Sequence, residues 1–163
     1  MQASSEIRIR QAGPLDTGTI ANVLYESFAE YEGLYTREGF LATTPSVDQI
    51  LARLREGPVW LAFREAMMLG TVAAVMKGQS AYMRGMAVLP AARGFRVGAQ
   101  LLEQVEDWAS SAGCRRVFLS TTPFLSAAIR LYERHGFRRT DEEPHELFGT
   151  PLFTMEKDVF GKG

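Results

Sequence analysis

The stretch from Val88 to Ala99 has the residue types and spacing of a phosphate-binding loop. An apolar run ends at Pro90, a loop with Gly94 and two arginines follows, and a helix containing Gly98 then begins without an acidic residue in its first turn. The first N–H groups of a helix lack intrahelical partners and lie at the positive end of the helix dipole, so they attract anions. The stretch therefore predicts a phosphate or pyrophosphate site, although its glycines alone would equally suit a tight structural turn.

Two common classes of phosphate site are disfavoured. The sequence has no G-x-x-x-x-G-K-[ST] motif, which excludes a P-loop nucleoside triphosphatase at the motif level. It also has no G-x-G-x-x-G motif and no opening βαβ unit, which makes a Rossmann dinucleotide site a poor fit. The charge distribution still favours an anionic ligand, because nine arginines and four acidic residues lie between Met83 and Thr140 in a chain whose net charge is −1.

A second cluster of chemically suggestive residues follows between Thr122 and Phe137. Its spacing places Ala128, Leu131 and Tyr132 on neighbouring faces of a short helix. The order and spacing of the two clusters resemble the GNAT superfamily of acyl-coenzyme A-dependent N-acyltransferases. That family has [Q/R]-x-x-G-x-[G/A] at its pyrophosphate loop and N-x-x-A-I-x-L-Y-x-x-x-G-F later in the chain. The resemblance covers nearly the whole sequence.

The sequence departs from the family pattern at two positions. Arg93 begins the loop motif, but Arg96 replaces its middle glycine. Arginine adopts a left-handed backbone less readily than glycine, although its guanidinium can contact a phosphate. Leu125 stands where the family has an asparagine. The resemblance thus implies either that this contact to the cofactor is missing or that Ser126 or Thr122 provides it.

The resemblance implies that acetyl-coenzyme A (acetyl-CoA) is the cosubstrate, and the scarcity of cysteine and histidine indicates that no metal takes part. The pantetheine arm would pair with Met86–Val88 like an added strand, which requires this strand to separate from Val117–Leu119. Gly85 is well placed to begin that separation. The pyrophosphate would contact the N–H groups from Phe95 to Ala99. The implied cofactor-binding residues are Met86, Ala87, Val88, Arg93, Gly94, Phe95, Arg96, Val97, Gly98, Ala99 and Ser126.

The resemblance also implies a chemical mechanism. A substrate amine would attack the thioester carbonyl directly in a ternary complex, and the Tyr132 hydroxyl would be the general acid that protonates the departing coenzyme A thiolate. Without the surrounding motif, Tyr132 would be interpreted as an ordinary core tyrosine. Cys114, which precedes Arg115, is interpreted as a packed side chain rather than a nucleophile.

The base that removes the proton of the amine is left open by the sequence. Many family members have a glutamate on the strand before the cofactor, but this chain has Arg84 there. The alternatives are Glu30 or Glu32 after the first helix, a water relay, or an amine that is already partly neutral. Arg84 either recognises an acidic group of the substrate or is simply solvated.

The wall of the acceptor pocket is expected to come from loops. Phe40 and the tyrosines of the segment after the first helix either form this wall or pack in the ordinary way. His145–Pro151 is a second candidate wall, in which His145 itself is interpreted as structural or exposed. The candidate substrate residues are Glu30, Tyr31, Tyr35 and Arg84.

Three functions are compatible with these features to different degrees. The first is transfer of an acetyl group to a primary amine of a small molecule, an amino acid or a peptide. The second is an acyl-CoA-binding module without turnover, which the missing asparagine and glutamate would favour. The third, nucleic-acid binding, is the weakest, because the net charge is close to zero and no stacking aromatic residues alternate with the arginines.

Composition indicates one globular domain. The chain has 163 residues, 46% of them hydrophobic, and we expect a single domain with a core over residues 7–159. One cysteine and two histidines argue against a disulfide framework and a zinc site. The apolar runs are too short to span a bilayer, and no secretory signal is recognisable, so we expect a cytoplasmic protein without membrane or nucleic-acid partners. The oligomeric state, a homodimer included, is left open.

The elements that position these residues follow from periodicity along the chain. Strands are expected near residues 6–10, 59–63, 69–76, 81–89, 117–119, 137–141 and 151–158, and helices near residues 20–31, 44–57, 97–112 and 126–135. This order predicts a mixed α/β (α+β) fold with helices on both faces of a sheet. The GNAT fold that the resemblance implies is a mostly antiparallel sheet of about seven strands, splayed between its central parallel pair.

Overall fold

The structure, a computed structural model, describes residues 6–159. The strands are β1 (Arg8–Gln11), β2 (Val59–Arg64), β3 (Met67–Lys77), β4 (Ser80–Val88), β5 (Arg116–Thr121), β6 (Arg138–Arg139), β7 (His145–Leu147) and β8 (Thr150–Asp158). The α-helices are α1 (Thr17–Phe28), α2 (Arg37–Thr43), α3 (Val47–Glu56), α4 (Val97–Ser111) and α5 (Ser126–Arg134). Short 3-10 helices are η1 (Pro14–Asp16), η2 (Ala29–Leu34) and η3 (Pro90–Ala92).

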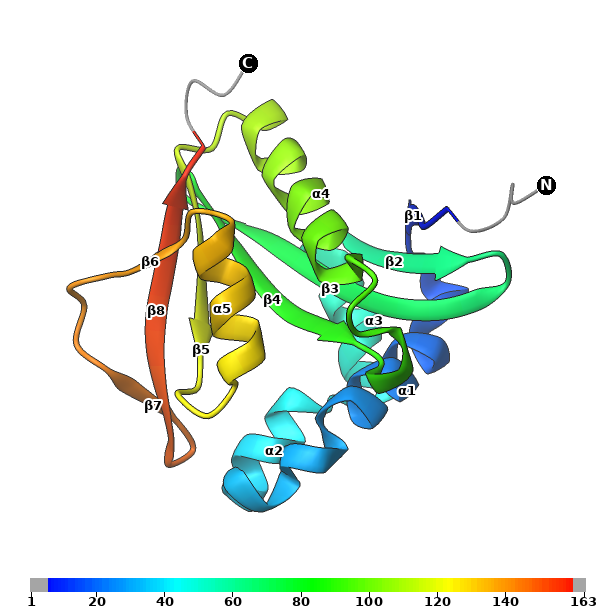
Figure 1. The fold of residues 1–163 in the computed structure, drawn as a ribbon, viewed down its shortest axis with the longest axis horizontal. Coiled ribbons are helices and arrows are strands. Elements are labelled where there is room, and N and C mark those ends of the chain that lie inside the picture. The colour runs from blue at the N-terminus through cyan, green and yellow to red at the C-terminus, as the bar shows by residue number, and fades with distance from the viewer. Residues whose placement is uncertain (1–5, 160–163) are drawn as a thin grey trace.

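The strands form an eight-stranded sheet in the order β1-β2-β3-β4-β5-β8-β6, with β7 paired to β8 (Figure 1). Within the described residues, β4 and β5 are the parallel pair and the other neighbours are antiparallel. The predicted mixed, mostly antiparallel sheet with one central parallel pair is therefore confirmed. It has one strand more than expected, because β7 was not predicted.

Helices cover both faces of the sheet, as predicted (Figure 1). α4 and α5 pack on one face in a core that includes Trp60 and Ala62 of β2. α1 and α3 pack on the other face in a core that includes Val59 and Leu61 of the same strand. Successive side chains of a strand point to opposite faces, so the uninterrupted apolar run of β2 supplies both cores.

The parallel strands β4 and β5 separate partway along their length. They pair over Ser80–Tyr82 and Arg116–Phe118, after which β4 stays with β3 and β5 stays with β8. The register between β3 and β4 shifts opposite Gly85, which has a φ of +62°. Glycine adopts this left-handed backbone without a Cβ clash, so it permits the bulge at which β4 turns away. The predicted separation of the parallel pair is confirmed, and it begins after Tyr82, three residues before Gly85.

Two elements were not predicted. α2 occupies part of the segment after α1 that was expected to be a loop, and β7 occupies part of the expected pocket wall. α2 begins after Thr36, whose hydroxyl accepts a hydrogen bond from the N–H of Gly39. The N–H of Thr36 donates to Thr150 Oγ1 at 2.9 Å, which ties α2 to the first residue of β8.

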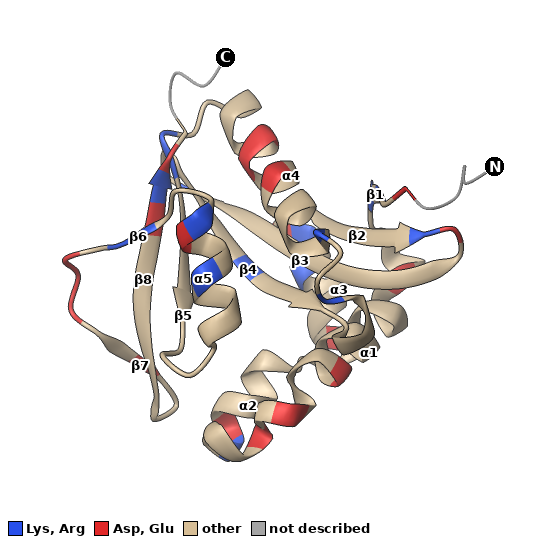
Figure 2. Ribbon diagram, viewed as in Figure 1, with Lys and Arg blue, Asp and Glu red and all other residues tan. Residues whose placement is uncertain are grey.

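Charge is unevenly distributed over these elements. Figure 2 shows basic residues on β4, on α5 and in the loop before α4, and acidic residues on α4. Across residues 6–159, none of the helices combines the length and the apolar character needed to cross a membrane. The same range contains no group of three or more acidic, histidine or cysteine side chains arranged to hold a metal ion.

Candidate active site

A cleft of about 840 Å³ lies where β4 and β5 separate. Its walls come from the diverging halves of the two strands, the loop before α4, the first turn of α4, α5, and side chains of α1, α2 and α3. Met86, Ala87 and Val88 line it along β4. Since β5 no longer pairs with β4 at these residues, the backbone on that side of β4 is available to a bound extended chain.

The first turn of α4 borders the cleft. Val97, Gly98 and Ala99 line it, and their N–H groups have no acceptors within the helix. Among the described residues no side chain caps this turn, and the turn contains no acidic residue. The positive end of the helix dipole therefore faces the cleft, which is the arrangement of an anion-binding site.

The backbone before α4 accounts for both unusual positions of the loop motif. Arg96 is the N-cap residue and has a φ of +65°, so it adopts the left-handed backbone for which the glycine of the motif would be suited. Gly98 permits close packing of α4 on α5, because a Cβ there would lie 2.7 Å from Leu131 Cδ2.

The cleft is lined by positive charge. Among the described residues, no aspartate or glutamate lines it. The arginines that line it are Arg53, Arg84, Arg93, Arg96 and Arg134. Such a wall attracts anions and repels cations.

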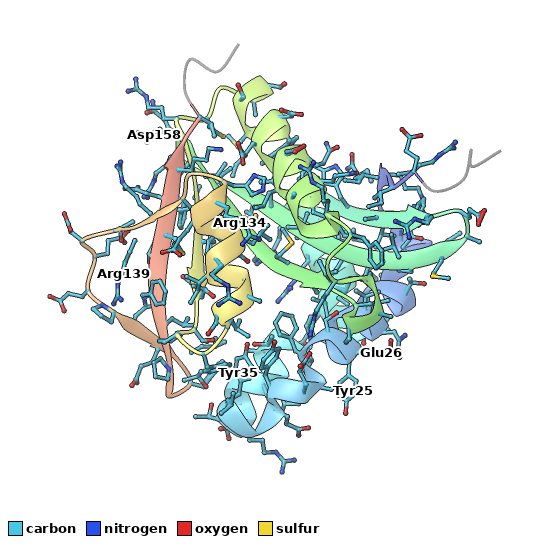
Figure 3. All side chains as sticks on the ribbon, viewed as in Figure 1. Tyr25, Glu26, Tyr35, Arg134, Arg139 and Asp158 are labelled. Atoms are coloured by element: carbon cyan, nitrogen blue, oxygen red, sulfur yellow. The ribbon has the colours of Figure 1, made fainter. Side chains whose placement is uncertain are left out.

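Other arginines of the basic region lie elsewhere. Arg116 pairs with Glu156 at 2.7 Å, and Arg138 pairs with the same carboxylate at 3.4 Å. Arg139 lies over the ring of Phe153, 4.4 Å from its centroid. Figure 3 shows the labelled Arg139 beside β8, whereas Arg134 lies on α5. Only some of the nine arginines between Met83 and Thr140 therefore line the cleft.

Arg93 connects the loop to the segment after α1. Its Nη1 lies 2.6 Å from Glu30 Oε1, and its Nη2 donates to the carbonyl of Ser27 at 3.2 Å. Glu30, a candidate substrate residue, is thus held by Arg93 and is not among the residues that line the cleft. Its carboxylate positions the loop and offsets part of the charge of Arg93.

Tyr132 lines the cleft from α5. It is 6% exposed, and its ring centroid lies 5.9 Å from that of Phe137. Burial raises the pKa of Tyr132 well above its ordinary value, and the nearby Tyr35 hydroxyl adds to this. The phenol is therefore neutral over the whole physiological pH range and can act as a hydrogen-bond or proton donor.

Two buried polar atoms at the cleft, Ser27 Oγ and Arg84 Nε, have no hydrogen-bond partner among the described residues. An unsatisfied buried polar group costs about 1–3 kcal/mol, so a ligand that supplies a partner is favoured at each. The Thr122 hydroxyl also lines the cleft and lies within reach of the Tyr35 hydroxyl. Of the two replacements suggested for the missing asparagine, Thr122 lines the cleft and Ser126 does not.

Two basic side chains meet where β4 turns away. Arg84 forms an ion pair with Glu56, which is 53% exposed and lies at the end of α3. Arg53 lies one turn earlier on α3, and its Nη1 is 3.5 Å from the position that a Cβ on Gly85 would occupy. Burial lowers the pKa of Arg53, and the neighbouring charge of Arg84 lowers it further.

Aromatic residues close the cleft near α2. Tyr31 and Tyr35 line it, as predicted for an acceptor wall. Both contact Phe124, with ring centroids 6.3 and 4.9 Å apart. Burial raises the pKa of Tyr35, which is labelled in Figure 3. Phe40 packs in the protein instead and is not a lining residue.

A serine and a histidine meet at the opposite wall. Ser120 of β5 lines the cleft, and its Oγ lies 3.2 Å from Nε2 of His145 on β7. His145 is exposed, as expected, and it is connected to the cleft through this hydroxyl. Cys114 is 1% exposed, with its Sγ 3.3 Å from Met76 Sδ, and burial raises its thiol pKa. That environment suits packing rather than nucleophilic attack.

The structure thus brings most of the predicted site residues to one cleft. Among the predicted residues, the ones that do not line it are Glu30, Phe95 and Ser126, together with the alternative base Glu32 and the expected wall residues Phe40 and His145. Phe95 is exposed, and Arg64 lies over its ring. Sequence reasoning missed Arg53, whose spacing on α3 resembled an ordinary solvated helix face.

The sequence matches a known protein family over most of its length. Residues 21–137 match the acetyltransferase (GNAT) family. The uncharacterized N-acetyltransferase YjgM of Escherichia coli is 32% identical over 133 residues, which are 77% of this chain and 78% of that protein. An IAA acetyltransferase of Azospirillum brasilense is 36% identical over 92 residues, 55% of this chain and 59% of that protein.

Solved structures show the same fold. The PaiA N-acetyltransferase of Thermoplasma acidophilum, in complex with coenzyme A, is similar with a TM-score of 0.80 over 94% of this chain and 99% of that chain, at 21% identity. YncA of Salmonella typhimurium, solved with its cofactor acetyl-CoA, is similar with a TM-score of 0.72 over 95% of each chain, at 23% identity.

Proposed function

Because the chain belongs to the acetyltransferase (GNAT) family, we propose that it transfers an acetyl group from acetyl-CoA to a primary amine by direct attack within a ternary complex. The observation that carries this proposal is the single cleft that joins the uncapped start of α4 to the hydroxyl-bearing wall at Tyr132. An anion site and a neutral donor that border the same cleft are what a phosphate-bearing thioester and its departing thiolate require.

The residues present fit coenzyme A. The N–H groups at the start of α4, with Arg93 and Arg96, would hold the pyrophosphate. The open side of β4 at Met86–Val88 and the hydroxyl of Thr122 would hold the pantetheine arm. Acetyl-CoA supplies an activated acyl group, so the protein needs no nucleophile of its own.

Residues of the chain would then take part in the two proton transfers of the reaction. Tyr132 would donate to the departing sulfur, since its phenol is neutral and borders the cleft. No carboxylate among the described residues lines the cleft, so the amine would lose its proton to water or through the hydroxyl of Ser120 toward His145. Glu30 is engaged with Arg93 and is a poor candidate for this base.

The proposed function is tested by measuring thiol release from acetyl-CoA with a panel of amines. Release is expected only when protein and a suitable amine are both present, with an acetylated amine as second product. An acyl-CoA-binding module without turnover would bind acetyl-CoA by calorimetry and release no thiol with any acceptor. This outcome would contradict the proposal.

Replacing Arg96 by glycine tests the unusual loop position. Glycine adopts the left-handed backbone of this residue at lower cost, so stability is expected to change by at most about 1 kcal/mol. Loss of a charge-assisted hydrogen bond to phosphate is worth about 1.5–3 kcal/mol, so acetyl-CoA affinity should fall at least about 10-fold. Calorimetry on Arg96→Gly and on Arg96→Asn, which also tolerates this backbone, measures the effect. Unchanged or higher affinity in both variants would mean that the guanidinium does not contact the phosphate.

A further inference from the structure

The cleft contains a second concentration of positive charge, away from the start of α4. Arg84 directly precedes Gly85, where β4 turns from β5, and Arg53 Nη1 reaches the same point from α3. Val88, which leads into the α4 loop, lies four residues after Arg84, and because of the bulge this stretch spans three residues of β3, about 10 Å at the rise of a strand. The Arg53–Arg84 pair is therefore separated from the proposed pyrophosphate site by the stretch that would hold the pantetheine arm.

The charges of this pair are not balanced within the protein. Glu56 compensates Arg84, but it is half exposed and does not line the cleft. Arg53 forms no ion pair with any described residue, although it is partly buried. Arg84 Nε is also buried without a hydrogen-bond partner. Two guanidiniums with one carboxylate leave an excess positive charge and unused donors at the cleft wall.

We propose that the Arg53–Arg84 pair binds the carboxylate of the acceptor, so that the acceptor is an amino acid whose carboxylate lies close to its amine. This inference rests on the proposed acetyl transfer. A guanidinium matches a carboxylate in charge and in the planar arrangement of its donors. The pair borders Gly85, next to the first residue proposed to hold the pantetheine arm, so the carboxylate and the reacting amine are a few bonds apart.

The same charges favour the reactive form of the amine. The acceptor's own carboxylate stabilises its ammonium ion, and pairing with the guanidiniums offsets that effect, which lowers the pKa of the amine and raises the fraction of neutral nucleophile. This accounts for a cleft that has no carboxylate base among its described lining residues. It also excludes polyamines as preferred acceptors, because they add positive charge to a positive wall.

The test compares each acceptor with its uncharged counterpart. α- and β-amino acids are assayed beside their carboxamides with saturating acetyl-CoA, in the wild type, Arg53→Gln, Arg84→Gln and Arg53→Lys. Arg55→Gln is the matched control, because Arg55 is an exposed neighbour on α3 that does not line this cleft. Binding of the same compounds to the coenzyme A-loaded protein is measured by calorimetry.

We expect at least one amino acid to exceed its carboxamide by 10-fold or more in kcat/KM. Arg53→Gln and Arg84→Gln should each reduce that preference at least 10-fold through KM of the amino acid, with KM for acetyl-CoA unchanged. Arg53→Lys should retain part of the preference for the amino acid over its carboxamide. Since loss of a positive charge raises the pKa of the bound amine, the acidic limb of kcat, which reports the bound complex, should move to higher pH in both glutamine variants.

Three outcomes overturn the inference: carboxamides equal to the amino acids, a preference that survives both glutamine substitutions, or no binding of any amino acid. Failure of the proposed function is distinguishable from these. In that case amino acids bind the coenzyme A-loaded protein in an Arg53- and Arg84-dependent manner, yet no thiol is released, and the carboxylate site stands without the transfer reaction.

Discussion

Replacing Tyr132 by phenylalanine is expected to lower kcat by about 100-fold or more and to leave acetyl-CoA affinity nearly unchanged. General acid catalysis contributes about 10²–10⁴-fold, and the substitution removes the donor alone. The ring that packs 5.9 Å from Phe137 is retained, so folding should be preserved. Steady-state thiol release gives kcat, and calorimetry with acetyl-CoA gives the affinity.

Tyr35 provides the matched control for this experiment. Tyr35 also lines the cleft, and burial also raises its pKa, so Tyr35→Phe removes a similar hydroxyl from the same cleft. A larger loss of kcat in Tyr35→Phe than in Tyr132→Phe would show that Tyr35, rather than Tyr132, is the proton donor. Because burial raises the pKa of Tyr132 above that of an ordinary phenol near 10, the wild type should not lose activity through this group below about pH 10.

The features of the fold that were predicted correctly depend on local rules. The bulge at Gly85 followed from a glycine inside an apolar strand, and the parallel pair followed from a helix that connects two strands. α2 was not predicted because residues that are distant in the sequence stabilise it. Gly39 interrupts its helical propensity, and a side chain there would collide with Thr150, which instead accepts a hydrogen bond from Thr36.

β7 escaped prediction for a related reason. It joins β8 through Phe148 and Gly149, both with positive φ, of 49° and 91°. Two-residue hairpin turns of this kind are recognised in sequences by asparagine or aspartate before glycine, and phenylalanine does not give that signal. The strand is formed because its partner β8 is already part of the sheet.

In the candidate site too, some residues could be predicted from the sequence and others could not. The phosphate loop and Tyr132 lie in two contiguous motifs, so their spacing in the sequence was sufficient to single them out. Arg53 and Arg84 lie on different elements and meet only because α3 packs beside the bulge of β4. An arginine on an amphipathic helix has the same sequence pattern whether it faces solvent or a cleft.

An aspartate at position 99 is expected to have opposite effects on folding and on cofactor binding. Ala99 lines the cleft as the third residue of α4, where an acidic side chain interacts favourably with the helix dipole. The same charge would repel a pyrophosphate at the helix start. Two unit charges about 6 Å apart at an effective dielectric of about 20 repel by about 3 kcal/mol, or about 100-fold in affinity.

Asparagine at the same position isolates the charge, because Ala99→Asn and Ala99→Asp add nearly the same volume. Ala99→Asp should bind acetyl-CoA about 100-fold more weakly than Ala99→Asn, while its thermal midpoint without ligand is equal or higher. The difference in affinity should shrink as salt is added, since added ions screen the repulsion. Equal affinity of the two variants would show that the phosphate groups lie away from α4, and coenzyme A would then have to bind by the arginines alone. A lower thermal midpoint for aspartate would mean that burial outweighs the dipole, without altering the conclusion from the affinities.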